Sequence, residues 1–380
     1  MKYIPYGHQW IDDEDIAAVI NVLKSEWIAA GPKTEEFEAA LREYVGCRHA
    51  AVVNSGTSAL DIAVQALDLP KGSEIITTPL TFAATANAAL YNNHKPVFAD
   101  IEKATRNISP ASIREKLTEK TKAIIYVDYA GHPCDIDEIK EIAEEKDLFL
   151  IEDSCHSLGA EYKGKKIGCH ADATVYSFHP VKQMTTGEGG AVVTNDGTLH
   201  EKHKMLRNHG IDRSARERFG PSAGYAYDMK YLGRNYRMTD FQAALGISQL
   251  RKLDSFIKRR REIAERYVEE FAGVSEIETP ETKSDVLHAW HIYTVLLKDI
   301  DRDMFFAKMK EKGIGVNVHY IPVYRFSYYR ELYGIDPRIF PVTEDVYKRI
   351  ITLPLFPGMT DEDVSYVIDA VKKTAAECKK

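Results

Sequence analysis

Between residues 74 and 155, short apolar runs alternate with longer amphipathic segments. Continuous apolar runs of this length are typical of strands buried on both faces, and the segments between them have the period of helices. Strands that alternate with helices predict a mostly parallel sheet covered by helices, an α/β fold. The predicted strands are EIITTP, KPVFADI, KAIIYVDYAG and LFLIEDSC, at 74–79, 95–101, 122–131 and 148–155.

The remaining segments extend this pattern and add a smaller C-terminal part. Residues 50–67, AAVVNSGTSALDIAVQAL, predict another strand, a turn and a helix. Residues 172–182 and 189–196 predict two strands joined by a glycine-containing turn, and 239–271 predict one long helix. We expect a large domain at 1–250 and a small α+β domain at 251–380. In the latter, 291–297 and 314–320 are predicted strands, 304–313 is a predicted helix, and Val364, Val367, Ile368 and Val371 form one face of a last helix.

An N-terminal helix is predicted as well. Asp12 or Asp13 can cap it, and Ile16, Val19, Ile20 and Leu23 follow at the spacing of a single apolar face.

Composition and charge exclude several classes of function. The 380 residues are 44% apolar and carry a formal net charge of -7, which argues against a nucleic-acid-binding protein. No apolar run reaches the length of a membrane span, and the first residues contain no apolar leader. The five cysteines are odd in number and scattered, as expected of reduced thiols in a cytoplasmic protein.

Polar residues follow the predicted strands at the edge where open α/β sheets bind ligands: the Ser55-Gly56-Thr57 run, Asp128 and Asp153. The run NSGTSAL opens a helix, whose unpaired N–H groups and dipole favour an anion. It lacks the lysine of a nucleotide-triphosphate loop, so a simple phosphate is expected, with an ordinary helix cap as the alternative.

Asp153 and Lys182 are the other two candidate groups. Asp153 ends the apolar strand LFLIED and needs a cation, such as a protonated pyridine nitrogen; a helix cap or an ion pair with an arginine of the chain is the alternative. Lys182 lies in YSFHPVKQMTTGEGG, where partial burial would lower its pKa and make it a nucleophile. Ser177 could hold the same phosphate, and Phe82 could stack on a ring. A phosphate site, a carboxylate and an amine together match pyridoxal 5'-phosphate.

The ordered segments NSGTSAL, TTPLTFAATANA, VDYAGHPCDI, IEDSCHSLGAEYKGKKIG, YSFHPVKQMTTGEGGAVVTND, RNHG and LGRNYRMTDFQAALGISQL cover most of the chain. With them the sequence resembles the DegT/DnrJ/EryC1/StrS sugar aminotransferases almost end to end. These are fold-type I pyridoxal phosphate enzymes that act on keto-sugar nucleotides. Some relatives have histidine in place of the lysine and are dehydratases, so Lys182 favours a transaminase.

The resemblance implies a role for each matching residue. Lys182 would hold the cofactor as a Schiff base and move the proton, Asp153 would pair with the pyridine nitrogen, and His156 would lie near the ring hydroxyl, where many members have glutamine. Asn235 would reach the phosphate from the neighbouring subunit, which implies a homodimer with shared active sites. The implied phosphate ligands are Gly56, Thr57 and Ser177, and the implied sugar-nucleotide site comprises Tyr6, Glu26, Trp27, Ile28, Ala29, Ser58, Asn235, Asn317, Val318, His319 and Tyr320.

The implied reaction moves an amino group from L-glutamate to C4 of a UDP-linked 4-keto-6-deoxy sugar in a pathway of the pseudaminic acid type. The alternatives are a dTDP- or GDP-linked sugar, or a regulator of the same fold that binds the cofactor without catalysis. Arg234 and Arg237 are candidate partners of the donor carboxylate, with dimer contacts as their alternative role.

Other chemistries fit the sequence less well. Cys155-His156 and Cys169-His170, with Cys134, lack the spacing of a zinc site, so no metal is expected. The region around Cys155 carries no cysteine-hydrolase signature, and the first strand–helix turn lacks the G-x-G-x-x-G of dinucleotide oxidoreductases.

Overall fold

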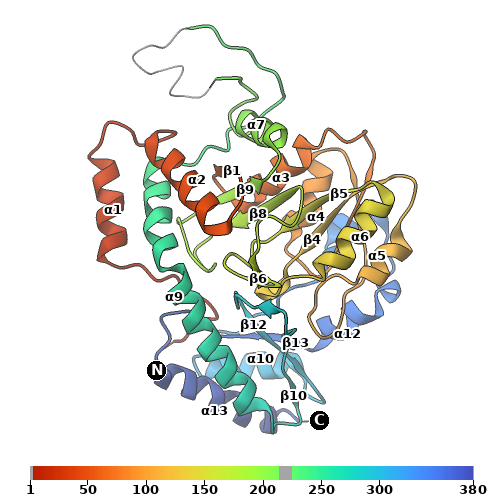
Figure 1. The fold of residues 1–380 in the computed structure, drawn as a ribbon. Helices are drawn as coiled ribbons and strands as arrows, with labels where there is room; N and C mark the ends of the chain where they lie inside the picture. Colours follow the sequence, from red (N-terminus) through yellow and green to blue (C-terminus); the bar gives the residue numbers. More distant parts are fainter. Residues whose placement is uncertain (1–2, 214–224, 380) are drawn as a thin grey trace.

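The computed structural model of the protein describes residues 3–213 and 225–379 (Figure 1). Every strand and helix predicted between residues 74 and 155 is present. None of the described helices is both long and apolar enough to cross a membrane. The helices are α1 (Asp13–Leu23), α2 (Pro32–Val45), α3 (Gly56–Ala66), α4 (Ala83–Tyr91), α5 (Pro110–Lys116), α6 (Ile136–Lys146), α7 (Gly197–Leu206), α9 (Asp240–Phe271), α10 (Arg302–Glu311), α11 (Ser327–Tyr333), α12 (Pro341–Arg349) and α13 (Asp361–Glu377), with 3₁₀ turns η1 (Tyr129–Gly131), η2 (Val323–Arg325) and η3 (Pro337–Ile339).

The central sheet has seven strands in the order β1-β9-β8-β5-β4-β2-β3. Strand β9 runs antiparallel to both β1 and β8, and the pairs from β8 through β5, β4 and β2 to β3 are parallel. The sheet is therefore mostly parallel, as predicted, and all its strands except β9 end at the same edge. The strands are β1 (His49–Val53), β2 (Glu74–Thr77), β3 (Lys95–Phe98), β4 (Thr121–Val127), β5 (Phe149–Asp153), β8 (Ala173–Ser177) and β9 (Gly190–Thr194).

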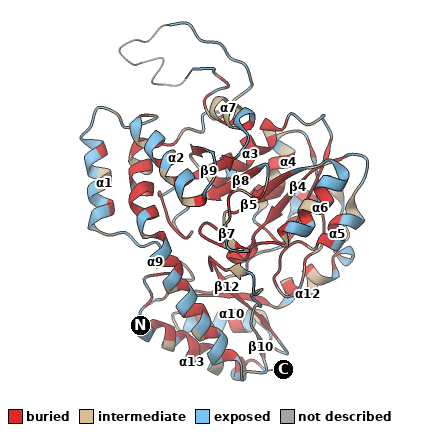
Figure 2. Ribbon diagram, viewed as in Figure 1, coloured by how far each residue is buried: buried red, intermediate tan, exposed pale blue. Residues whose placement is uncertain are grey.

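Helices cover both faces of this sheet, and the strands are buried between them (Figure 2). Along β4, Ala123 and Ile125 pack toward one face, and Ile124 and Tyr126 toward the other, because side chains alternate along a strand. Helices α3, α4 and α7 cover the first face. Helices α2, α5, α6 and the first half of α9 cover the second, which completes an α/β/α arrangement.

Two small antiparallel sheets complete the fold: β10 (Ile277–Glu278), β12 (Tyr293–Leu297) and β13 (Ile350–Leu353), and β11 (Val286–Leu287), β6 (Glu161–Tyr162) and β7 (Lys165–Lys166). Helices α10, α13 and the second half of α9 pack with the first of these sheets. The predicted domain boundary at residue 250 falls inside α9, which is one continuous helix. The division of the chain at that point stays a prediction.

Helix α1 begins as predicted, with the Asp12 side chain accepting the backbone N–H of Asp15. Its apolar face, however, lies on the surface of the single chain: Ile16, Ile20 and Leu23 are 49%, 42% and 57% exposed. The face that is buried instead carries Asp15 and Val22, and the helix packs against α9, where Asp15 lies 2.9 Å from Lys252. Figure 2 shows α1 largely exposed at the outer side of α9.

The strand predicted at 314–320 does not form. Asn317 exchanges two backbone hydrogen bonds with Thr352 of β13, and this is an isolated bridge. Ile314 makes another single bridge to Ile4. The chain then leaves the small sheet, so that His319 and Tyr320 reach the edge of the large sheet instead of pairing along β13.

Candidate active site

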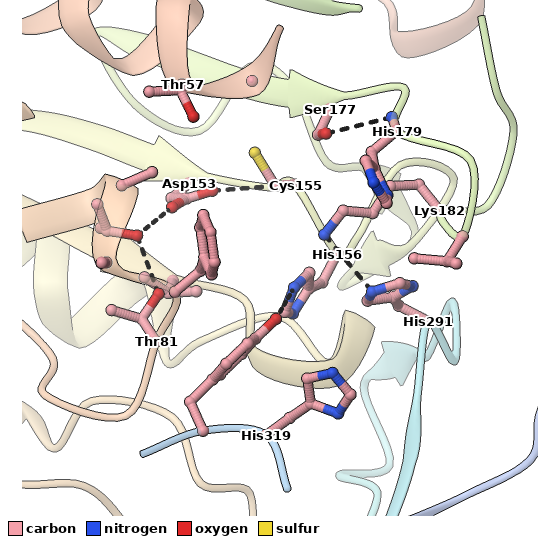
Figure 3. Close-up of a pocket in the computed structure, with 18 of the residues that line it drawn as sticks. Thr57, Thr81, Asp153, Cys155, His156, Ser177, His179, Lys182, His291 and His319 are labelled. Carbon is pink, nitrogen blue, oxygen red and sulfur yellow. Dashed lines mark hydrogen bonds between the residues drawn. The ribbon is translucent and has the colours of Figure 1, made fainter. Parts of the chain in front are cut away.

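A cavity of about 650 Å³ lies where the strands of the central sheet end (Figure 3). The β1–α3 turn, the β2–α4 turn, the ends of β5 and β8, and the segment after Gly315 all contribute to its wall. The structure therefore brings together residues predicted from distant parts of the chain. The predicted residues that line the cavity are Tyr6, Gly56, Thr57, Phe82, Asp153, His156, Ser177, Lys182, Asn317, Val318, His319 and Tyr320.

Lys182 lies in the loop that joins β8 to β9. Because these strands are antiparallel neighbours, the loop leaves and re-enters the sheet at the same edge. The Lys182 side chain extends into the cavity, where its Nζ lies 3.5 Å from Nε2 of His291 (Figure 3). Burial lowers the pKa of the Lys182 amine, and the nearby Cys155 and Asp153 act in the opposite direction. A lysine with a lowered pKa is a stronger nucleophile at neutral pH, as the sequence indicated.

Asp153 is the last residue of β5 and is 4% exposed. Its Oδ2 accepts a 2.7 Å hydrogen bond from the hydroxyl of Thr85, and its Oδ1 accepts one from the backbone N–H of Cys155. Within the described residues it forms no ion pair, and it caps no helix. A buried carboxylate with only neutral donors still lacks a compensating cation, and the cavity is the place where a cationic group could supply one.

The β1–α3 turn forms the predicted anion site. Ser55 caps α3 by accepting the N–H of Ser58, which leaves the first N–H groups of the helix directed outward. Ser177 lies opposite: a Cβ added to Gly56 would be 2.8 Å from the Ser177 Cβ. Gly56 therefore allows the backbone to approach Ser177 closely, and both residues face the cavity beside Thr57 (Figure 3).

His156 is buried and its tautomer follows from its contacts. Burial, together with the charge of Lys182, lowers the pKa of His156 well below its usual value, so the ring is neutral at pH 7. The backbone N–H of Ala130 donates to Nδ1 at 3.3 Å. A neutral imidazole has one acceptor and one donor nitrogen, so Nε2 carries the proton and donates to the Tyr320 hydroxyl at 3.0 Å.

Several predicted residues do not line the cavity of the single chain. Residues 26–29 lie beside the start of α9, where Ala29 bridges Thr239, and Asn235 bridges Asn208 on the same approach to α9. Ser58 is buried behind the anion site, and its hydroxyl donates to Asn54. Neither residues 26–29 nor Asn235 lines the cavity of this chain.

The remaining polar candidates do not line this cavity. Asp128 is fully buried and accepts hydrogen bonds from Ser154, Ser157 and the backbone of Cys134. Burial raises its pKa to about 6, and it does not line the cavity. Arg234 lies 3.7 Å from Asp61, and Arg237 donates to Asn208, so neither reaches the cavity in this chain.

Other cavity residues were not predicted from the sequence. Thr81 and Thr85 hydrogen-bond to each other below Asp153, and their spacing at the start of a helix is the signal that could have indicated them. His291 comes from the segment before β12, far from Lys182 in the sequence. Cys155, His179 and Glu188 also line the wall.

Comparison with known proteins now decides the family. Residues 9–372 match the DegT/DnrJ/EryC1/StrS aminotransferase family. The chain belongs to this family. It is 42% identical, over 99% of both chains, to the UDP-4-amino-4,6-dideoxy-N-acetyl-beta-L-altrosamine transaminase of Campylobacter jejuni. It is also 40% identical to the spore coat polysaccharide biosynthesis protein SpsC of Bacillus subtilis, over 97% of this chain and 96% of that protein.

Solved structures of aminotransferases agree with this assignment. PseC of Helicobacter pylori, an aminotransferase of pseudaminic acid biosynthesis, superposes with a TM-score of 0.92 at 35% identity over 99% of this chain and 100% of that chain. The PLP form of the sugar aminotransferase Spr1654 of Streptococcus pneumoniae gives a TM-score of 0.92 at 30% identity, over 99% of both chains. The protein is thus a fold-type I sugar aminotransferase that uses pyridoxal phosphate.

The residues of the cavity fit this cofactor. The α3 N-terminus with Ser177 offers N–H and hydroxyl donors for a phosphate, and Asp153 provides a carboxylate without a cation partner for a protonated ring nitrogen. Lys182 supplies the amine that an aldehyde needs. All three groups lie in one cavity, and they match the phosphate, the ring nitrogen and the aldehyde of the cofactor.

Proposed function

We propose that the protein transfers the amino group of L-glutamate to C4 of a UDP-linked 4-keto-6-deoxy sugar, in a pathway of the pseudaminic acid type. The observation that supports this type of reaction is that Lys182, whose pKa is lowered, shares a cavity with Asp153, a buried carboxylate that forms no ion pair with a described residue. The similarity to the Campylobacter altrosamine transaminase and to PseC supports the choice of sugar and nucleotide.

Within this proposal the residues divide the work. Gly56, Thr57 and Ser177 hold the phosphate, while Asp153 pairs with the ring nitrogen and keeps it protonated. The bound cofactor supplies an electron sink for the substrate carbon that loses or gains a proton. His156 would lie near the ring hydroxyl, where many relatives have glutamine, and its Nε2 proton is donated to the Tyr320 hydroxyl, which lines the same cavity.

Lys182 is the proposed base. Once its amine is free, it removes a proton from the donor carbon and returns one to the cofactor side, and it makes the reverse transfer to the sugar. The lowered pKa increases the neutral fraction of the amine, which is the form that accepts a proton. L-Glutamate leaves as a 2-oxo acid, and the C4 carbonyl of the sugar becomes an amine, so atoms and electrons balance between the two substrates.

The sugar nucleotide is proposed to enter beside Tyr6 and residues 317–320. His319 contributes a ring within 5.2 Å of Tyr6, and Tyr320 carries its hydroxyl to His156. Phe82 lies at the same mouth, 6.3 Å from the Tyr320 ring, where we propose that it covers one face of the cofactor. This wall combines aromatic surface with hydroxyl and imidazole groups, which suits a sugar attached to a nucleotide.

A homodimer with shared sites is part of the proposal. The apolar face of α1, formed by Ile16, Ile20 and Leu23, is exposed in the single chain, and a second copy of the chain would bury it. The same arrangement would bring residues 26–29 and Asn235, which lie outside the cavity of their own chain, to the cavity of the partner. The substrate and the phosphate would then be bound by both protomers.

The substrate assignment can be tested with a panel of UDP-, dTDP- and GDP-linked 4-keto-sugars and L-glutamate as donor. We expect the UDP sugar to be aminated fastest, with one molecule of 2-oxoglutarate formed per aminated sugar, and NMR would give the configuration at C4. Faster amination of a dTDP or GDP sugar would transfer the proposal to that nucleotide. Absence of amination with every sugar would contradict it.

A further inference from the structure

Arg260 is a fully buried arginine on α9 whose charge has no carboxylate partner among the described residues. Its Nη1 donates to the backbone carbonyls of Trp290, His291 and Leu355, at 3.2, 3.0 and 2.9 Å. Its Nη2 donates to the carbonyl of Lys182 at 3.4 Å. An arginine buried against neutral carbonyls alone keeps much of its desolvation cost, so stability by itself is a poor reason for its presence.

The four carbonyls come from three separate segments that meet at this guanidinium: the β8–β9 loop, the segment before β12 and the segment after β13. Two of the four residues, Lys182 and His291, are the pair whose side chains face each other in the cavity. The planar guanidinium therefore fixes the backbone of both members of the pair at once, and with it the distance between their side chains.

The segment that presents His291 is held under backbone strain. Trp290 has a φ of 46°, in the left-handed region that bulky residues avoid. The N–H of His291 donates to Ala130 on one side, and Arg260 binds the carbonyls of Trp290 and His291 on the other. Strain of this kind persists only where contacts enforce it, and it is common at functional sites.

His291 is suited to hold the free amine of Lys182. Burial, with the charge of Lys182, lowers the pKa of His291 well below its usual value, so the ring is neutral. Its Nε2 can accept a hydrogen bond from Nζ, while no described group contacts Nδ1 by a hydrogen bond. An acceptor at this point limits the positions that the amine can adopt before it takes a proton or attacks an aldehyde.

We propose that Arg260 is a positioning residue, which fixes the backbone of Lys182 and His291 so that the His291 Nε2 holds the Lys182 amine at its point of reaction. The inference rests on the proposed role of Lys182 and adds an explanation of how the Lys182 amine is positioned. Arg260 touches neither cofactor nor substrate and acts through the other two residues.

The test compares Arg260→Lys with Arg106→Lys. Arg106 is the matched control: it is 2% exposed, its Nη1 donates to the carbonyl of Ala104, and it makes no described contact with Lys182 or His291. Two experiments are needed. The first measures the rate at which cofactor-free protein captures pyridoxal phosphate, from the absorbance of the lysine-bound form. The second measures kcat and KM for L-glutamate and the sugar nucleotide.

We expect Arg260→Lys to slow capture and kcat by roughly 10- to 100-fold with KM changed by less than about twofold, because a small misplacement of a reacting group has effects of this size. Arg106→Lys should lower thermal stability and leave the capture rate near that of the wild type. A wild-type capture rate in Arg260→Lys, or equal slowing in both variants, would overturn the proposal. Should the wild type capture cofactor but aminate no sugar, only the proposed function fails, since the capture rates still decide the role of Arg260.

A second pair of variants tests the contact between His291 and Lys182 directly. It also provides a test if Arg260→Lys does not fold. His291→Gln keeps an acceptor near the Nε2 position, whereas His291→Phe removes it and retains an aromatic ring. We expect His291→Phe to slow capture by about tenfold or more and His291→Gln to retain most of the rate, in line with the loss of one positioned contact. Equal and unchanged rates in both would overturn the proposal.

Discussion

The Oδ2 of Asp153 accepts a 2.7 Å hydrogen bond from the hydroxyl of Thr85, which is itself within 2.9 Å of the Thr81 hydroxyl. Asp153 ends β5, whereas Thr85 lies in the first turn of α4, which follows β2, so the contact joins two units of the sheet that β4 separates. The hydrogen bond from the Thr85 hydroxyl to one carboxylate oxygen fixes the plane of the Asp153 carboxylate. It thereby also fixes the orientation of the carboxylate relative to the cavity.

Thr85→Val removes the hydrogen bond and keeps the shape of the side chain. A hydrogen bond to a charged group contributes about 1.5–3 kcal/mol, so we expect a loss of roughly 10- to 100-fold in kcat/KM. Asp153→Asn should reduce kcat further, because it removes the charge that keeps the ring nitrogen protonated. Steady-state kinetics with L-glutamate measures both, and Thr85→Ser is the control that keeps the hydroxyl. Wild-type kinetics in Thr85→Val would show that the contact has no functional role.

Lys182→Ala should abolish turnover, since no other described lysine lines the cavity. The expected loss in kcat is at least about 10²–10⁴-fold, the usual contribution of a positioned acid–base group. The purified variant should also lack the long-wavelength absorbance of the lysine-bound cofactor, while pyridoxamine phosphate still binds. Exposed Lys163 gives the control Lys163→Ala, which should retain both properties. A native spectrum with normal turnover in Lys182→Ala would refute its assignment.

Gly56→Ala tests the anion site by filling it. The added methyl group would lie 2.8 Å from the Ser177 Cβ and 3.1 Å from the Cys155 Sγ, so one wall must move. We expect the affinity for pyridoxal phosphate to fall by about tenfold or more, because overpacking costs about 1–3 kcal/mol. Equilibrium titration with the cofactor measures this. Gly273→Ala, outside the cavity wall and with nothing within 4 Å of the added methyl group, controls for a general effect of the substitution. Unchanged affinity in Gly56→Ala would argue against a phosphate at the β1–α3 turn.

His203 on α7 predicts a loss of stability in acid. The side chain is fully buried, no described group bonds to either ring nitrogen, and burial, with positive neighbours such as Arg207, lowers its pKa to about 3. An unfolded histidine titrates near pH 6.5, so between these values the unfolded state binds a proton that the folded state does not. Stability therefore falls as the pH decreases from about 6.5 toward 3, by up to about 1.4 kcal/mol per pH unit from this residue.

The variant His203→Leu should show a correspondingly weaker dependence on pH. Urea unfolding between pH 7 and 4.5 gives the free energy of unfolding for wild type and variant, and the difference between their slopes is the contribution of His203. The exposed His8 supplies the control variant His8→Gln. Parallel slopes for wild type and His203→Leu would show that the buried ring does not exclude a proton.

Mixing two inactive variants tests the shared site. If Lys182 of one protomer and Asn235 of its partner form one site, a mixed dimer of Lys182→Ala and Asn235→Ala has one intact site and one doubly altered site. An equal, fully exchanged mixture should recover about a quarter of wild-type activity, as a two-fold symmetric dimer requires. Mixtures in which Ile16→Glu is added to both chains should recover nothing, because the charge prevents the face of α1 from being covered. No recovery in the first mixture would place Asn235 outside the site.

The sequence allowed prediction of the sheet and of the residues at its strand ends. Buried parallel strands need continuous apolar runs, and polar groups such as Asp153 and Ser177 stand out directly after them. Lys182 could be predicted for the same reason, since its loop follows a buried strand and precedes glycines. Local pattern and topology therefore agree at these positions.

Contacts between distant segments could not be predicted. Nothing local links Arg260 to Lys182, or His291 to the β8–β9 loop, because these meetings depend on how the small sheet packs against the large one. The period of α1 indicated an apolar face but not which surface packs against it. The strand expected at 314–320 does not form, because the chain makes a single bridge from Asn317 to Thr352 and then turns away from β13.

The long helix α9 has a consequence for how the molecule comes apart. Ala243 and Leu253 belong to the core beneath the central sheet, whereas Tyr267 and Phe271 belong to the core of the small sheet. A helix of 32 residues is about 48 Å long and joins both cores without a break. Unfolding of either core would remove the apolar contacts of half of α9 and destabilise the other half. Heating should therefore give a single cooperative transition in calorimetry instead of two.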